Sequence, residues 1–312
     1  MRIILLLFFV PILLCAQKKT SAPSCNEEYY RYVIGTLAND SMEGRLPGTK
    51  AELQSANFIE KEFQAAGCKP LQKGKFAFPF DYISPDSVTP VHSSGNVIAK
   101  IETKSDYCII ISAHYDHIGF GKFHSNDPFT HAIHNGADDN ASGVALMLGL
   151  AGWCNEHTKE LHYDIVFIAF SGEEDGLFGS KYFLSQNLVD TSKIICDLNF
   201  DMVGHLDLQR PLLEVEGVRK ISAWDSILPN DSSAHFNVER DNVMIKGGAD
   251  HCTFLDAHIP AVLFSTGLTA YYHRPEDDLE TINFSGMLAI SDYMKVILCA
   301  LNKKKDLESI LK

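Results

Sequence analysis

From residue 96 onward, short apolar runs typical of β-strands alternate with longer segments typical of α-helices. The run at residues 163–170 is apolar almost throughout, which indicates a strand that is buried on both faces. This alternation predicts an α/β fold of three layers, in which helices flank a central twisted sheet that is mixed but mostly parallel. The predicted strands are residues 96–101, 107–113, 163–170, 194–200 and 261–264, and the predicted helices are residues 141–154, 177–187 and 284–301.

The chain before residue 96 contributes two more predicted helices. Residues 27–37 have a helical pattern, and residues 50–66 form an amphipathic helix that Gly67 ends. Residues 41–48 between them are rich in turn-forming residues. Since no linker, repeat or low-complexity tract interrupts the chain, we predict a single domain over residues 17–312, with a polar start at residues 17–26.

The first sixteen residues have the pattern of an export signal. Arg2 supplies the positive start, and the apolar run from Ile3 to Leu14 is shorter than the roughly 20 residues that a membrane span needs. Cleavage after Ala16 would release an exported protein, either periplasmic or secreted. Lipid attachment at Cys15 is the alternative, and the bulky Leu14 before it disfavours that alternative. No later segment is expected to span a membrane.

Charge and cysteine content narrow the function classes. The chain has 27 Lys and Arg against 40 Asp and Glu, which gives a net charge of −13 and no basic stripe, so we expect no nucleic-acid partner. Seven of the eight cysteines remain after the signal, and none belongs to a C-x-x-C pair. We therefore expect them to be mostly buried small side chains rather than a disulfide framework. Nothing in the sequence indicates an oligomeric state.

Histidine and acidic residues occur just after the predicted strands. His114 follows the strand at residues 107–113, Glu173 and Glu174 come soon after the strand ending at residue 170, and Asp201 follows the strand ending at residue 200. Ligand sites in open α/β sheets gather at the carboxyl ends of strands. We therefore expect these separate stretches of chain to converge on one edge of the sheet.

Each of these motifs has a simpler explanation when it is taken alone. His114 and Asp116 could be a polar strand end, one of residues 138–140 could cap the following helix, and Glu173-Glu174 could be a solvated acidic turn. His273, in an irregular aromatic stretch, could be structural. Together, however, they offer the two imidazoles and three carboxylates that a pair of zinc ions needs, plus a spare glutamate for proton transfer.

Local geometry suggests how these residues divide the work. His114 and Asp116 are two positions apart, so Asp116 can hold the imidazole in one tautomer. Asp139 lies in a glycine-flanked turn, where one carboxylate can present its oxygens to two cations. Two adjacent glutamates in a turn cannot point the same way, so one of Glu173 and Glu174 can bind metal while the other acts as general base.

Five signatures in order resemble those of the co-catalytic zinc aminopeptidases. This family includes the secreted bacterial leucine aminopeptidases and has relatives among the glutamate carboxypeptidases and glutaminyl cyclases. The resemblance covers roughly residues 30–300 and implies a single zinc-exopeptidase domain. The signatures are HYDH at residues 114–117, NGADDNASG at 135–143, FSGEE at 170–174, NFDM at 199–202 and Tyr272-His273.

The resemblance also implies roles for individual residues. One of two zinc ions would be held by His114, Asp201 and bridging Asp139, and the other by Glu174, His273 and the same Asp139. Glu173 would be the general base and Asp116 would orient His114. Tyr272 would steady the oxyanion, with Tyr271 as its rival. The family also often has a cis peptide after the bridging aspartate, here Asp139-Asn140.

The loop between Asp116 and Asn135 departs from the family pattern. It carries four additional histidines that could trap adventitious metal or shape the entrance of the site, although we expect them to be solvated loop residues: His117, His124, His131 and His134.

The sequence thus predicts a di-zinc metallo-exopeptidase that hydrolyses N-terminal residues from peptides with a free amino terminus. The nearest rival is a glutaminyl cyclase, which works with a single zinc, and a carboxypeptidase or dipeptidase is a second rival. A catalytically inactive binding module would require lost ligands, and all five are present.

Overall fold

The computed structural model describes residues 22–311, except for 85–91, 122–123, 208, 210, 230–235, 242–247 and 308–310. The predicted export signal, Cys15 and the first part of the polar start lie outside these residues. Within the described residues, nine strands form one mixed sheet. The strands are β1 (Lys69–Pro70), β2 (Ala77–Tyr82), β3 (His92–Ile101), β4 (Cys108–His114), β5 (Asp164–Phe170), β6 (Ile194–Phe200), β7 (Leu212–Glu216), β8 (Asn237–Arg240) and β9 (Ala261–Ser265).

The centre of the sheet is parallel and its margins are antiparallel. The order is β1-β3-β5-β4-β6-β9-β7-β8, with β2 also paired to β3. β5, β4, β6 and β9 run parallel to one another, whereas β3 and β7 run antiparallel to their neighbours β5 and β9. The predicted fold class, a mixed but mostly parallel sheet flanked by helices, is confirmed.

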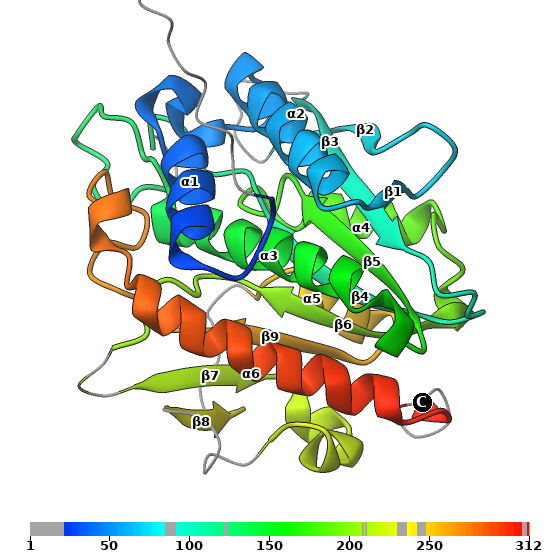
Figure 1. Cartoon of the computed structure of the whole chain (residues 1–312). Coiled ribbons are helices and arrows are strands. Elements are labelled where there is room, and N and C mark those ends of the chain that lie inside the picture. Colours follow the sequence, from blue (N-terminus) through cyan, green and yellow to red (C-terminus); the bar gives the residue numbers. More distant parts are fainter. Residues whose placement is uncertain are drawn as a thin grey trace, which may run out of the picture.

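Helices cover both faces of the sheet (Figure 1). α1, α2, α3 and α6 lie on one face, and α4 and α5 lie on the other. Alternate side chains of β4 point to opposite faces of the sheet. Ile109 and Ile111 belong to the core under α1, α3 and α6, and Ile110 belongs to the core under α4 and α5. The helices are α1 (Glu27–Leu37), α2 (Lys50–Ala65), α3 (Gly143–Glu156), α4 (Phe178–Ser185), α5 (His251–Asp256) and α6 (Phe284–Lys303).

The helices begin and end where the sequence has capping residues. Asn26 accepts a hydrogen bond from the N–H of Tyr29 at 2.8 Å and starts α1, and Thr49 accepts from the N–H of Glu52 at 3.2 Å and starts α2. Gly67, with φ of 79°, follows α2, as its position in the sequence predicted. These caps explain why the predicted bounds of both helices agree with the structure to within one residue.

α6 corrects one expectation. By length and composition alone it could cross a membrane, whereas we expected no such segment after the signal; it is the one helix of this kind in the described part of the chain. More than half of its apolar window, 56%, is buried, and it packs against α1 and α3. It is therefore placed as a core helix.

The described cysteines form no disulfide, and most are buried, as expected. Cys108, Cys154 and Cys196 lie in the core, while Cys299, which was also expected there, is half-buried.

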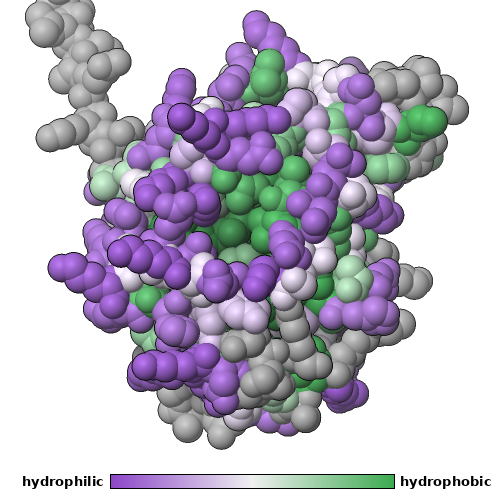
Figure 2. Space-filling model, turned by 90° about the vertical axis from the view of Figure 1, so that its right-hand side faces the viewer, coloured by the Kyte–Doolittle hydropathy of each residue, from purple (hydrophilic) through white to green (hydrophobic). Residues whose placement is uncertain are grey.

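The end of the molecule at the right of Figure 1 carries a recessed hydrophobic area bordered by hydrophilic side chains (Figure 2). The carboxyl-terminal ends of α3 and α6 reach this end. Residues that precede β6 and β9, among them Ser192, His258 and Pro260, line a cavity of about 570 Å³. Among the described residues that line this cavity, His258 is the one imidazole and none is a carboxylate, so the cavity offers a single side chain of the kind that binds zinc.

Candidate metal centre

The residues predicted to form a metal site lie at the carboxyl ends of the parallel strands. His114 is the last residue of β4, Asp201 directly follows β6, and Glu173 and Glu174 occupy the turn after β5. His273 comes from the segment after β9. Because these strands are parallel neighbours, their carboxyl ends share one edge of the sheet, and the structure brings all five predicted ligands together there.

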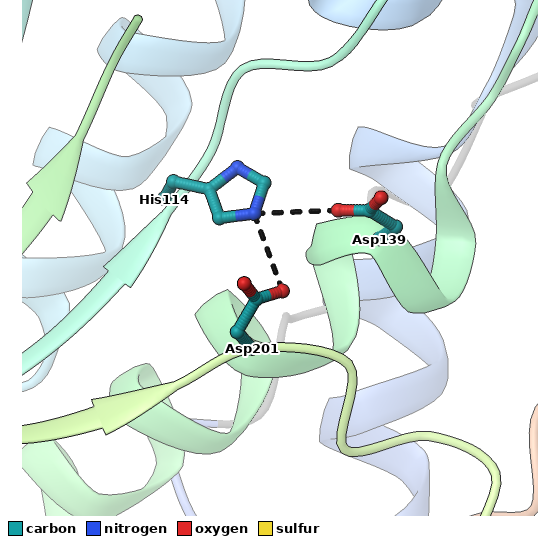
Figure 3. Close-up of side chains that lie close together, drawn as sticks. All are labelled: His114, Asp139 and Asp201. Atoms are coloured by element: carbon teal, nitrogen blue, oxygen red, sulfur yellow. Dashed lines mark hydrogen bonds and ion pairs between the residues drawn. The ribbon is translucent and has the colours of Figure 1, made fainter. Parts of the chain in front are cut away.

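One imidazole faces two carboxylates on the β4–β6 side of this edge (Figure 3). His114 Nε2 lies 3.3 Å from Asp139 Oδ1 and 3.4 Å from Asp201 Oδ1. His114 is almost fully buried, and Asp139 is 3% exposed. Three donor atoms from distant parts of the chain therefore converge on one point that solvent hardly reaches.

A second imidazole faces two carboxylates on the other side of Asp139. His273 Nε2 lies 3.1 Å from Asp139 Oδ2 and 3.1 Å from Glu174 Oε2. The two oxygens of Asp139 thus face different histidines, Oδ1 toward His114 and Oδ2 toward His273. This is the arrangement expected of a carboxylate that bridges two cations.

The donor separations test whether zinc fits. Zinc bonds to nitrogen and oxygen ligands are about 2.0–2.1 Å long in a tetrahedral site, so two donors on one ion lie roughly 3.3 Å apart. The four distances above, from 3.1 to 3.4 Å, match this value. Imidazole and carboxylate are also ligands that zinc accepts. Both groups of residues therefore fit the ion.

The charge balance of the site also favours cations. Burial, together with the neighbouring carboxylates Glu174 and Asp201, raises the pKa of Glu173 well above its ordinary value. Burial and the nearby Asp139 and Glu174 likewise raise the pKa of Asp201. These buried carboxylates repel one another, and divalent cations between them would relieve that repulsion.

Asp139 is free for this role because its neighbours make the structural contacts of the turn. Asn140 Oδ1 accepts hydrogen bonds from the N–H groups of Gly143, the first residue of α3, and Met202. None of residues 138–140 occupies the N-cap position of α3, which is Ser142. Asp138 accepts from the N–H of Gly204 at 2.7 Å. The Asp139-Asn140 peptide bond is cis, as expected.

Two residues that sequence reasoning missed hold this turn in place. The carboxylate of Asp277 accepts the N–H groups of Asp138 and Asp139 at 2.9 and 3.0 Å. Arg45 is fully buried, and its guanidinium donates to backbone carbonyls. The acceptors are the carbonyl oxygens of Leu37, Tyr115, Asn135 and Gly136.

Asp116 lies at the site, but its carboxylate is closer to the two-glutamate turn than to His114. Its carboxylate accepts the backbone N–H groups of Glu173 at 3.3 Å and Glu174 at 3.4 Å. His114 Nδ1 lies 3.7 Å from Asp116 Oδ1 and 3.2 Å from the backbone oxygen of the same residue. Since β4 ends at His114, the strand alternation used to predict their pairing stops before Asp116. Asp116 thus connects the His114 segment to the two-glutamate turn.

Glu173 and Tyr272 line the same small cavity as the ligands, with a volume of about 40 Å³. Met202, Ser265 and Leu268 also contribute to its wall. The ring of Tyr272 stacks on that of His273, with centroids 3.9 Å apart. Tyr271 is not among the residues that line this cavity, and it lies instead beside His205. The placement therefore favours Tyr272 over Tyr271 for contact with a substrate.

The expectation for the loop histidines is wrong in two of four cases. His124 and His131 are exposed, but His117 and His134 are fully buried. The loop folds back onto the site, because the N–H of Asn126 donates to the backbone oxygen of His273 and His273 Nδ1 lies 2.7 Å from the backbone oxygen of His124. The HYDH motif itself was the only signal for His117, and it carried no information on burial.

Comparisons with known proteins identify the family of this chain. The family model described as "Peptidase family M28" matches residues 96–298. The chain is 32% identical over 187 residues to the alkaline phosphatase isozyme conversion protein of Escherichia coli (strain K12), which covers 57% of this chain and 53% of that protein. It is 28% identical over 218 residues to aminopeptidase YwaD of Bacillus subtilis (strain 168), and this match covers 65% of this chain and 43% of that protein. The chain thus spans about half the length of these curated relatives.

Among solved structures, glutaminyl cyclase of Porphyromonas gingivalis has a similar fold. The TM-score is 0.72 at 18% identity, and the match covers 90% of this chain and 99% of the cyclase. At this identity the similarity concerns the fold alone.

Proposed function

Because the chain belongs to peptidase family M28, we propose that it is a zinc-dependent aminopeptidase that releases single residues from the amino terminus of peptides. The observation that supports this most strongly is Asp139, whose two oxygens face two separate histidine and carboxylate pairs. Such an arrangement suits two zinc ions per chain. His114, Asp201 and Asp139 would hold one ion, and His273, Glu174 and Asp139 the other.

Zinc bound there would supply Lewis acidity, which polarises a carbonyl group and lowers the pKa of water. The carboxylate of Glu173 lines the cavity without serving as a ligand in this assignment. It would accept a proton from the attacking water and return it to the nitrogen of the leaving amine. The Tyr272 hydroxyl would donate a hydrogen bond to the developing oxyanion. The buried carboxylates would also attract the free amino group of a peptide.

The wall of the cavity suggests which residue is released. Met202, Leu268 and the ring of Tyr272 give it an apolar side. Leu268 is 60% exposed, so a substrate side chain could cover it. The proposed substrates are therefore peptides with a free amino terminus and an apolar first residue.

Metal analysis combined with a substrate panel tests this proposal. The panel pairs aminoacyl anilides that have a free amine with their N-acetylated counterparts, and adds a peptide with N-terminal glutamine. Two zinc ions per chain, with cleavage of the free-amine substrates alone, would support the proposal. One zinc ion per chain, together with formation of pyroglutamate from the glutamine peptide, would instead establish the cyclase alternative. The similarity of the fold to that of a glutaminyl cyclase is the reason for including this peptide. Cleavage of the N-acetylated substrates would contradict recognition of the amine.

Export of the chain remains a proposal of its own. We expect the mature protein to begin at Gln17, after cleavage behind Ala16. Sequencing the amino terminus of the protein recovered from its native host tests this, and recovery of an intact Met1 would contradict it.

A further inference from the structure

His117 lies against the proposed metal ligands although it was expected to be a solvated loop residue. It is fully buried, and its Nδ1 is 2.7 Å from Glu174 Oε1. The same nitrogen lies 3.9 Å from Asp139 Oδ2, and the ring meets that of His273 edge-on, with centroids 5.6 Å apart. His117 therefore lies on the side of the site where His273, Glu174 and Asp139 Oδ2 come together.

The fold leaves a specific space for this ring. Gly136 has a left-handed φ of 58°, and a Cβ atom placed there would collide first with the backbone oxygen of Asp139 and would lie 2.6 Å from Cδ2 of His117. A side chain at position 136 would therefore disturb both the Asp139 turn and the imidazole. Glycine at this position, next to the turn that carries Asp139, allows His117 to reach Glu174.

The contacts divide the two oxygens of Glu174 between two histidines. Oε1 lies against Nδ1 of His117, and Oε2 lies 3.1 Å from Nε2 of His273. A distance of 2.7 Å is that of a strong hydrogen bond. It is shorter than the roughly 3.3 Å that separates two donors on one tetrahedral zinc ion. The geometry therefore favours an Nδ1–H donor over direct metal ligation by His117.

We propose that His117 is a positioning residue for one of the two metal subsites: it donates Nδ1–H to Oε1 of Glu174 and leaves Oε2 as the single oxygen directed at the metal beside His273. This inference rests on the proposed two-zinc function. A carboxylate held in this way keeps one orientation before the metal arrives. Hydrogen-bond partners of metal ligands typically change metal affinity by about 10- to 100-fold when they are removed.

The test compares three variants by zinc titration of the metal-free protein against a competing chelator, which gives the two dissociation constants separately. His117→Ala should weaken one zinc equivalent by about 10- to 100-fold and leave the other within about threefold. His117→Asn, whose amide can still donate to Glu174, should retain most of the affinity. His131→Ala, which removes an exposed histidine of the same loop, should match the wild type.

The visible spectrum of cobalt-loaded protein shows whether His117 positions Glu174 or binds the metal directly. The visible d–d spectrum responds to the ligand set, so it should be the same for His117→Asn and the wild type. Wild-type affinity for both ions in His117→Ala would overturn the inference. So would a His117→Asn variant that loses as much affinity as His117→Ala, or that alters the cobalt spectrum, because either result would make His117 a ligand. Circular dichroism shows whether each variant is folded. If His117→Ala does not fold, the comparison of His117→Asn with the wild type still tests the inference.

Failure of this inference can be told apart from failure of the proposed function. A wild-type protein that binds fewer than two zinc ions contradicts the function whatever the variants do. A wild-type protein that binds two zinc ions and cleaves the free-amine substrates, together with an unaffected His117→Ala variant, contradicts the inference alone.

Discussion

Arg45 should be among the most sensitive positions in the protein although it touches neither substrate nor metal in the proposed mechanism. Its guanidinium ties Tyr115, which lies between His114 and Asp116, to the segment that leads into the Asp139 turn. Replacing it with methionine keeps much of the side-chain volume and removes every donor. We therefore expect Arg45→Met to reduce both the stability of the metal-free protein and its affinity for zinc.

The magnitude follows from the carbonyl oxygens that lose a partner. Gly136 keeps a second donor, because its oxygen also accepts the N–H of Ala141 at 3.2 Å. The other three would each cost about 1–3 kcal/mol as unsatisfied buried groups, or roughly 3–9 kcal/mol together. Against this, burial lowers the pKa of Arg45 from 12.5 to about 10, so removing the charge recovers about 3 kcal/mol. From the middle of the first range, about 6 kcal/mol, the expected net loss is about 3 kcal/mol.

Urea unfolding of the metal-free protein, followed by circular dichroism, measures this loss without any contribution from bound zinc. A loss of this size also predicts a fall in melting temperature of roughly 6–12 °C. Arg31→Met is the matched control: Arg31 is about half exposed and pairs with Glu27 at the surface, so its loss should change stability by less than about 1 kcal/mol. An Arg45→Met variant whose unfolding free energy stays within about 1 kcal/mol of the wild type, with unchanged zinc affinity, would refute this reasoning.

Three further outcomes are expected. Glu173→Gln should reduce turnover by at least about 100-fold, in line with the loss of a general base, and leave zinc content unchanged; activity near the wild-type level would exclude Glu173 as the base. Removing zinc with a chelator should lower the unfolding free energy by about 2.7 kcal/mol for each occupied site, relative to free zinc at 100 times the dissociation constant of that site, and added zinc should restore it. Equal melting curves with and without zinc would contradict a metal that binds the folded state. Burial raises the pKa of Glu62, which accepts the Tyr29 hydroxyl at 2.9 Å, so its contribution to stability should be present below the unfolded pKa and be lost as the pH rises through the native pKa. Glu62→Gln should remove that part of the pH dependence in urea unfolding, and an unchanged pH profile would show that Glu62 is not its source.

The central strands and long helices were predictable because their patterns are local. The strand predicted at residues 194–200 agrees with β6, and the helix predicted at residues 27–37 agrees with α1. The family predicted from the five motifs is likewise confirmed by the match over residues 96–298. Convergence of the ligands followed from strand direction, because the carboxyl ends of parallel strands share one edge. The roles assigned to individual ligands stay predictions until metal is measured.

Marginal elements and tertiary contacts were missed for physical reasons. β2 alternates exposed and buried residues along its length, which is a valid strand signal, but Pro79 interrupts it and favours an edge position. β7 is short and α5 has six residues, so neither gives a strong periodic pattern. The burial of His117 and the carbonyl contacts of Arg45 depend on loops that meet only in the folded chain. No local pattern encodes such contacts.

The distribution of the ligands along the chain has a consequence for assembly. His114 ends β4, Asp139 lies in the turn before α3, and His273 comes from beyond β9; Glu174 and Asp201 follow β5 and β6. The donors of the subsite formed by His114, Asp139 and Asp201 are therefore complete once β6 has joined the sheet, whereas the subsite that needs His273 also requires the chain beyond β9. Zinc at the second subsite would accordingly report that all four parallel strands are in place.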